Sequence, residues 1–346
     1  MSVAGLRVPV RVVVVCCTAL VAAAACSADG PTGVWDTPVV TAVADPADLS
    51  PPLRDYVAVV PGGVYSVPFR QISSAGWSTC GVLIGGGFSC IGEDSSDIDG
   101  NLPPATPARA AEFVQIASGG SSACGLLADG TLRCGGFNGY RQAEPPSGIY
   151  THVTAAGSFA CALTPAGAVV CWGRNDELQS EPPSGTYTYV TAGGRFACAL
   201  EPAGAVVCWG DNEHGQSEPP PGSYTHVTAG FGFACALTTD DAAVCWGRNE
   251  DGQSEPPPGS YARITAGAYH ACALTATSAA VCWGWNEDGQ SEPPRGSYID
   301  IAAGFRHTCA LTVDRRLECW GALYDPEPVD DPPFDYEPAG LERIYR

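Results

Sequence analysis

Cysteine spacing constrains the fold of this chain more than any other feature of its sequence. Six cysteines follow one another at intervals of 37 residues, and each has a second cysteine ten residues later. A seventh pair precedes them after an interval of 44 residues. The seven pairs are Cys80 and Cys90, Cys124 and Cys134, Cys161 and Cys171, Cys198 and Cys208, Cys235 and Cys245, Cys272 and Cys282, and Cys309 and Cys319. Seven repeats therefore run from about residue 67 to residue 320.

The composition of one repeat predicts short β-strands. YTHVTA, FACAL and AVVCW are β-branched or aromatic runs separated by turns rich in Gly and Pro. No long window keeps an apolar period of 3.6 residues, which argues against helical repeats. We therefore expect an all-β fold, a seven-bladed β-propeller occupying residues 55–346. If the segment 57–67 forms a further hairpin, the propeller has eight blades instead.

The two cysteines of each pair flank a tight turn, as in CALTPAGAVVC. In an antiparallel hairpin they can lie opposite each other on the same face, close enough for a disulfide. Free buried thiols and a metal site are the alternatives, but the five histidines do not follow the spacing of zinc ligands. We expect a cross-strand disulfide in each blade, and neither a metal nor a cofactor.

The first 25 residues have the pattern of a lipoprotein-type signal peptide. Two arginines precede an apolar run of about fourteen residues, and small residues lead to Cys26. The seven pairs leave Cys26 as the single odd cysteine after residue 25, which supports its lipidation over ordinary cleavage. A tether rich in Pro, Ala and Asp follows at 26–54. The sequence thus predicts an exported protein, lipid-anchored at the cell membrane or cell surface.

The end of the chain has the pattern of a closing strand. An acidic, proline-rich insertion occupies 322–340, and the final segment, 341–346, resembles the first strand of a repeat. Because a ring of blades must be closed, we expect 341–346 to complete a blade begun by N-terminal strands.

The formal net charge of −20 restricts the class of partner. A strongly acidic surface repels nucleic acid and anionic lipid, so we expect no nucleic-acid partner and membrane contact through the lipid anchor only. The expected protein is a monomer that binds a protein partner.

The repeat resembles that of the regulator of chromosome condensation family. Segments such as CALEPAGAVVCWGDNEHGQ and CALTTDDAAVCWGRNEDGQ carry this resemblance, which covers about three quarters of the chain. It implies a seven-bladed propeller, and export makes the secreted bacterial β-lactamase inhibitory protein II type the most similar subgroup. Nucleotide exchange and chromatin binding, known in the family, suit a eukaryotic interior and are not expected here.

Most polar and aromatic residues recur in phase, which favours structural roles. We expect the tryptophan that follows the second cysteine in five of the seven pairs to pack between blades, and the QSEPP glutamates to be solvated. Asp94, Asp97 and Asp99 have imperfect calcium-loop spacing. For the central channel we expect small and aromatic repeated residues, whereas a propeller enzyme acting on polysaccharide would have a mixed charged cluster there.

Two positions vary between repeats and favour Arg and aromatic residues, which are enriched in interface hot spots. One follows the Ala-Gly step and the other follows Trp-Gly. The candidate partner-binding residues are Arg195, Phe231, Tyr269, Phe305, Arg306, Arg174, Arg248 and Trp285. We expect a non-catalytic protein-binding scaffold that uses loops on one propeller face. The alternatives are an inhibitor of an extracellular or periplasmic enzyme, of β-lactamase or transpeptidase type, and a polysaccharide-active propeller enzyme.

Overall fold

The computed structural model describes residues 69–92 and 112–323. All of them belong to the second of two compact units, Ser50–Arg346, and the first unit, Met1–Leu49, lies outside the described residues. The predicted signal peptide, Cys26, the tether, the 57–67 hairpin and the closing strand 341–346 also lie outside them. The same holds for the acidic triplet at 94–99.

The described residues form 21 short strands and no helix. The strands are β1 (Phe69–Ala75), β2 (Ser78–Leu83), β3 (Phe88–Gly92), β4 (Phe113–Ser118), β5 (Ser122–Leu127), β6 (Leu132–Gly136), β7 (His152–Ala155), β8 (Phe159–Leu163), β9 (Val169–Gly173), β10 (Tyr189–Ala192), β11 (Phe196–Leu200), β12 (Val206–Gly210), β13 (Tyr224–Ala229), β14 (Phe233–Thr238), β15 (Ala243–Gly247), β16 (Tyr261–Ala266), β17 (His270–Thr275), β18 (Ala280–Gly284), β19 (Tyr298–Ala303), β20 (His307–Thr312) and β21 (Leu317–Gly321). Each repeat supplies three of them.

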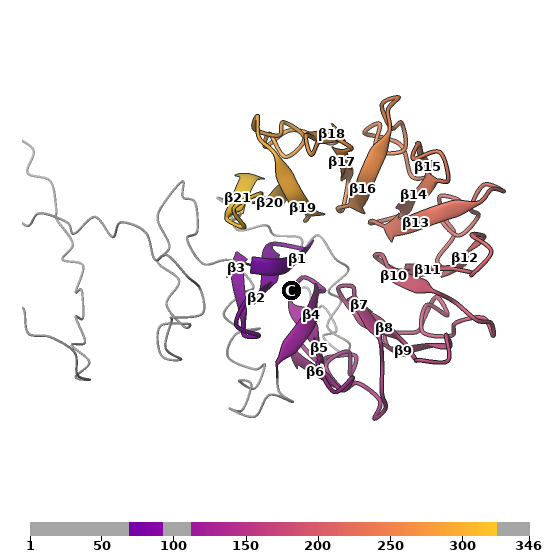
Figure 1. Ribbon diagram of the computed structural model, residues 1–346. Helices are drawn as coiled ribbons and strands as arrows, with labels where there is room; N and C mark the ends of the chain where they lie inside the picture. Colours follow the sequence, from indigo (N-terminus) through magenta and orange to yellow (C-terminus); the bar gives the residue numbers. More distant parts are fainter. Residues whose placement is uncertain (1–68, 93–111, 324–346) are drawn as a thin grey trace, which may run out of the picture. The chain divides into compact units, whose positions relative to one another are not determined.

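These strands pair into seven separate antiparallel sheets of three consecutive strands each. We number the sheets as blades 1 to 7 in chain order, from β1–β3 to β19–β21. Figure 1 shows the blades arranged around a common axis, with the first strand of each innermost. The predicted seven-bladed propeller is therefore confirmed.

Alternation along the middle strands builds the interfaces between blades. In β11, Phe196, Cys198 and Leu200 face blade 5, where they pack against Ala234 and Ala236 of β14. The intervening alanines, Ala197 and Ala199, point to the opposite side of blade 4 and face blade 3. Since side chains alternate across a strand, FACAL presents a large face to one neighbour and a small face to the other. This complementarity repeats from blade to blade and lets the blades stack closely.

The ring closes by direct packing of blade 7 against blade 1. Phe69 and Ile72 of β1 join Leu311 and Leu317 of blade 7 in one buried cluster. The Phe69 amide donates to the Arg315 carbonyl at 3.3 Å. Every described sheet takes all its strands from a single repeat, so closure among the described residues needs no exchanged strand.

Each blade contains the predicted disulfide. All seven pairs are bonded, with Cα atoms 4.0–4.1 Å apart. In blade 4, Cys198 lies opposite Cys208. Backbone hydrogen bonds link Glu201 with Ala205 and Asp211 with Arg195, which places the cysteines at a non-hydrogen-bonded position of the ladder. The cross-strand prediction is therefore confirmed, including its register.

Candidate functional site

The repeated tryptophans hold neighbouring repeats together. Each indole Nε1 donates to the backbone carbonyl of a glutamine thirty residues earlier, at 2.8–3.0 Å. The side chains are only 7–8% exposed. The residues are Trp172, Trp209, Trp246, Trp283 and Trp320. Their predicted packing role is confirmed, and these residues are not available to a partner.

The repeated loop residues are also engaged within the fold. The Asn175 amide donates to Glu181 at 2.9 Å and accepts from the Ser180 backbone at 3.0 Å. The Tyr187 hydroxyl donates to the Pro183 carbonyl at 3.2 Å. Equivalent asparagine contacts recur at Glu218, Glu255 and Glu292. The expected solvated glutamates are exposed, but each also braces its own loop.

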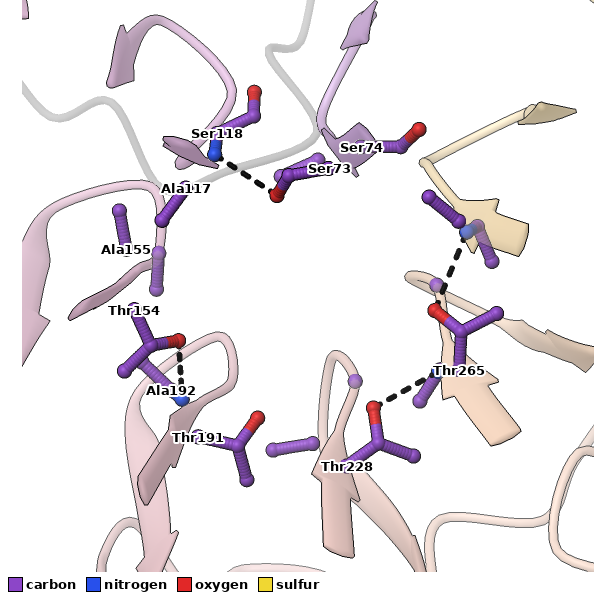
Figure 2. Close-up of a pocket in the computed structure, with 18 of the residues that line it drawn as sticks. Ser73, Ser74, Ala117, Ser118, Thr154, Ala155, Thr191, Ala192, Thr228 and Thr265 are labelled. Atoms are coloured by element: carbon purple, nitrogen blue, oxygen red, sulfur yellow. Dashed lines mark hydrogen bonds between the residues drawn. The ribbon is translucent and has the colours of Figure 1, made fainter. Parts of the chain in front are cut away.

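With these residues assigned to the framework, the central channel is the main cavity to consider. It has a volume of about 320 Å³ and is lined by the first strand of every blade. Figure 2 shows a ring of small side chains, with the Thr154, Thr228 and Thr265 hydroxyls accepting backbone N–H groups of the next blade. These bonds join innermost strands that belong to different sheets.

A second ring, which we call the polar ring, lines the channel near the start of each first strand. It contains one residue from each blade: Gln71, Gln115, His152, Tyr189, His226, Arg263 and Asp300. The expectation of only small and aromatic repeated residues in the channel is therefore wrong at this position. The repeat tolerates the change because these side chains line the channel and do not belong to the interdigitated apolar interfaces between blades.

Part of the polar ring is bonded across blade boundaries. The Gln115 amide exchanges two hydrogen bonds with the Val153 backbone, at 2.9 and 3.2 Å. His152 Nε2 donates to the Val190 carbonyl at 3.1 Å, so its Nδ1 accepts from Gln115 at 3.1 Å. Burial lowers the pKa of His152 to about 4, so its imidazole stays neutral.

The last two blades carry buried histidines where blades 3 to 5 have phenylalanine. His270 Nε2 bonds to the Thr308 hydroxyl and His307 Nε2 to the Thr79 hydroxyl, both at 2.8 Å. Burial lowers their pKa values, to about 3 for His270 and about 4 for His307. Both side chains are fully buried inside the blade interfaces, where these hydrogen bonds link neighbouring blades.

The opposite end of the channel is formed by the turns between first and second strands. We call these turns the channel mouth. They are Gly76-Trp77, Gly120-Ser121, Gly157-Ser158, Gly194-Arg195, Phe231-Gly232, Ala268-Tyr269 and Phe305-Arg306. The preceding glycine keeps them close: a Cβ at Gly230 would lie 2.4 Å from the Gly267 carbonyl oxygen. Blades 2 and 3 present Gly and Ser here, whereas blades 5, 6, 7 and 1 present aromatic residues.

The aromatic side of the mouth forms one continuous cluster. Phe305 stacks edge-on with Trp77 at 5.1 Å and with Tyr269 at 5.5 Å, between ring centroids. Phe231 lies 5.7 Å from Tyr269, and Trp285 lies 6.0 Å from it. Trp77 and Phe305 are buried, and the other three are half-buried. We call these five residues the aromatic cluster.

Two arginines border the aromatic cluster. Arg306 lies over the rings of Trp77 and Trp285, at 5.6 and 5.4 Å from their centroids. It also forms a two-bonded ion pair with Asp288. Arg248 lies 4.9 Å from the Tyr269 centroid. Such contacts hold the guanidinium groups in place over the aromatic surface.

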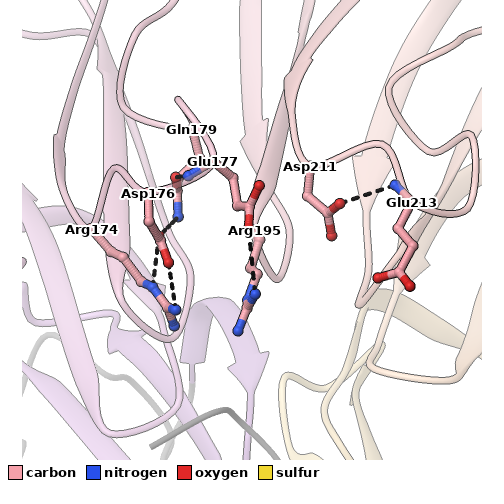
Figure 3. Close-up of polar contacts among 7 residues, drawn as sticks. All are labelled: Arg174, Asp176, Glu177, Gln179, Arg195, Asp211 and Glu213. Carbon is pink, nitrogen blue, oxygen red and sulfur yellow. Dashed lines mark hydrogen bonds and ion pairs between the residues drawn. The ribbon is translucent and has the colours of Figure 1, made fainter. Parts of the chain in front are cut away.

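Arg174 and Arg195 have a different environment on blades 3 and 4, shown in Figure 3. Arg174 Nε and Nη2 donate to the two carboxylate oxygens of Asp176, at 2.7 and 2.6 Å. Arg195 pairs with Glu177 at 3.6 Å. Of the eight candidate residues, six are therefore gathered at the aromatic side of the mouth, and Arg174 and Arg195 lie on blades 3 and 4. Acidic pairing does not set these two apart, because Arg248 pairs with Glu250 and Arg306 with Asp288.

Sequence reasoning missed Trp77. Its signal was present, because Trp77 stands one residue before Ser78, in phase with Arg195, Tyr269 and Arg306. The divergent loops of blade 1 concealed that phase.

Among the residues that the structure describes, no cluster of His, Cys, Asp or Glu could hold a metal ion, and no helix is long and apolar enough to cross a membrane.

Comparisons with known proteins agree with this architecture. The family model described as the regulator of chromosome condensation (RCC1) repeat matches residues 187–216, 224–253, 261–290 and 298–322. No curated protein sequence matches the chain.

Similar solved structures include two plant receptor kinase ectodomains. The entire ectodomain of CR4 from Physcomitrella patens is 27% identical, with a TM-score of 0.63 over 72% of each chain. The ectodomain of ACR4 from Arabidopsis thaliana is 26% identical, with a TM-score of 0.61 over 74% of this chain and 96% of that one.

Prp20p from Saccharomyces cerevisiae shares the fold at 16% identity, with a TM-score of 0.58 over 75% of this chain and 82% of that one. Together with the seven three-stranded sheets, the four matched segments show that the chain contains RCC1-type repeats within a seven-bladed β-propeller.

Proposed function

We propose that this propeller is a protein-binding scaffold whose partner contacts the aromatic side of the channel mouth. The observation that carries the proposal is the half-buried part of the aromatic cluster, Phe231, Tyr269 and Trp285, bordered by Arg248 and Arg306. The buried Trp77 and Phe305 support this surface from beneath. Trp, Tyr and Arg are the residue types that dominate binding energy in protein interfaces.

The asymmetry of the mouth supports recognition of an asymmetric partner. Four adjacent blades present aromatic residues, while blades 2 and 3 present only Gly and Ser. A ring of identical repeats has no preferred side, so specific binding requires such a break in symmetry. We call the Gly and Ser turns of blades 2 and 3 the low side of the mouth. Their small side chains leave room for a protruding loop of the partner beside the aromatic cluster.

The backbone holds these residues in position before a partner binds. The Phe231 amide donates to the Ala268 carbonyl at 3.3 Å, and the Ala268 amide donates to Gly304 at 3.0 Å. The Phe305 amide donates to Gly76 at 2.8 Å and so links blades 7 and 1. Pre-ordered loops lose little conformational entropy on binding, which favours affinity.

We further propose that the protein is exported and anchored at the cell surface through lipid on Cys26. The signal-like first 25 residues and the odd Cys26 support this, as do seven disulfides, which are typical of oxidising compartments. The two receptor ectodomains of 26–27% identity are consistent with an extracellular use of the same repeat.

The binding proposal is tested by chemical cross-linking and quantitative mass spectrometry in the native envelope. The test variant is Tyr269→Ala with Trp285→Ala. The matched control is Ile149→Ala with Val313→Ala, which removes two exposed apolar side chains, 53% and 64% exposed, away from the mouth.

A partner captured by the wild type and the control should be lost from the mouth variant, with affinity reduced about thirtyfold or more. Undiminished capture by the mouth variant would contradict the assigned surface. Circular dichroism of both variants verifies that the propeller remains folded.

A further inference from the structure

The polar ring is not used uniformly by the fold. In blades 1 to 3, its side chains are committed to the next blade. Gln71 bonds both the amide and the carbonyl of Ile116, at 2.9 and 3.1 Å, and Gln115 bonds Val153 in the same manner. Of Val190, His152 bonds the carbonyl alone. The role of these three residues is therefore to link adjacent innermost strands.

Blades 4 and 6 supply groups with hydrogen-bonding capacity left over. The Tyr189 ring is stacked between His152 and His226, at 4.6 and 4.9 Å. Its hydroxyl, however, takes no hydrogen bond within the described residues, and burial raises its pKa to about 12. Thr191 lines the same wall and, unlike Thr154, holds no backbone amide in Figure 2. Both hydroxyls can therefore donate into the channel.

Neighbouring hydroxyls also point donors at this space. Thr228 accepts the Ala266 amide at 3.1 Å, and Thr265 accepts the Ala303 amide at 3.3 Å. A hydroxyl that accepts from the backbone keeps its own hydrogen for another acceptor. The wall of blades 4 to 6 therefore offers several hydroxyl donors to the channel.

Arg263 adds a positive charge to the same wall. One guanidinium nitrogen donates to Asp300 at 3.0 Å, and the side chain remains 58% exposed, so further N–H groups face the channel. The Asp300 carboxylate also accepts the Ile72 and Ile301 amides, at 3.3 and 3.1 Å. Its charge is thus enclosed by donors, while Arg263 keeps unused ones.

We propose that blades 4 to 6 form a binding site in the channel for a small oxyanion, a carboxylate or a phosphate. Arg263 pairs with the anion, and Tyr189, Thr191, Thr228 and Thr265 donate hydrogen bonds to its oxygens. The cavity of about 320 Å³ has the size of a small-molecule site. This site lies at the polar ring and does not depend on protein binding at the mouth.

Isothermal titration calorimetry of the purified full-length protein tests the site, with inorganic phosphate and glucuronate as separate probes. We expect saturable binding of one anion per chain, and the tighter probe identifies the chemical source. Arg263→Gln should weaken it on the order of tenfold, because it removes the charge while keeping a donor for Asp300. Tyr189→Phe and Thr191→Val, which remove one hydroxyl each, should weaken it several-fold.

Arg316→Gln is the matched control, because Arg316 is also 58% exposed and also paired with an aspartate, Asp314. It should leave anion binding unchanged. Absence of binding by both probes, or equal binding by Arg263→Gln and wild type, would overturn the proposal. Loss of anion binding with retained partner capture would leave the proposed function intact, so the two can fail separately.

Discussion

Two tryptophans of adjacent repeats, Trp246 and Trp285, show how one residue type serves two regions of the propeller differently. Trp246 ends β15 inside a blade interface, where its indole donates to the Gln216 carbonyl at 2.9 Å. Trp285 follows β18 at the channel mouth, where it contacts Tyr269 and Arg306. Tryptophan occupies the position of Trp246 in five blades, whereas other blades carry different residues at the position of Trp285. Repetition therefore marks the framework, and its interruption marks the surface available for recognition.

We expect the largest loss in the free energy of unfolding for Trp246, and a much smaller loss for Trp285. Trp246→Ala should cost about 3–5 kcal/mol in the free energy of unfolding, because it leaves a cavity between blades and an unpaired carbonyl. Trp285→Ala should cost about 1 kcal/mol, as expected for a half-buried surface side chain. Guanidinium unfolding of both variants measures the difference. Equal losses would show that the mouth is part of the framework.

Acidification should destabilise the interfaces through their buried histidines. His270 and His307 have folded pKa values of about 3 and about 4, below the unfolded value near 6.5. The unfolded state therefore binds more protons below pH 6.5. Stability is full above that pH and should fall towards pH 4, because protons bind the histidines of the unfolded state before those of the folded state. Asp300, whose pKa is raised by burial, offsets part of this fall.

The variant His270→Phe with His307→Phe isolates that contribution, since blades 3 to 5 already hold Phe at the same position. Its unfolding free energy, measured from pH 7 to pH 4, should fall less steeply than that of the wild type. Parallel curves for the two proteins would refute the assignment to these histidines.

Removing one disulfide should have a smaller effect. Cys198→Ala with Cys208→Ala opens a short loop, and the expected loss is about 2–3 kcal/mol in the chain-entropy model. Chemical unfolding of this variant gives the value, and partner capture should persist because the pair lies inside a blade interface. An unchanged unfolding midpoint would argue against stabilisation by these bonds.

The sequence predicted the framework well because its constraints are local and repeated. Cysteines ten residues apart across one turn can lie opposite each other in a hairpin, and seven copies in phase define the blades. The tryptophan and glutamate roles followed from the same periodicity, although the glutamate contacts with asparagine were not anticipated. The N-terminal and closing-strand predictions lie outside the described residues and stay predictions.

The channel was predicted less well because its residues are brought together by the ring and not by the chain. Tyr189, His226 and Arg263 stand 37 residues apart, and only closure places them around one cavity. Six of the eight candidate residues meet at the aromatic side of the mouth, while Arg174 and Arg195 lie on blades 3 and 4, which present no aromatic residue in their mouth turns.

Site-specific photo-cross-linking in the native envelope tests the central claim most directly. A photoreactive residue is placed at Ser158, on the low side of the mouth, or at Ala262, an exposed residue beside Arg263 at the other end of the channel. The account predicts a protein cross-link from Ser158 and none from Ala262. A partner that cross-links from Ala262 alone would contradict binding at the mouth.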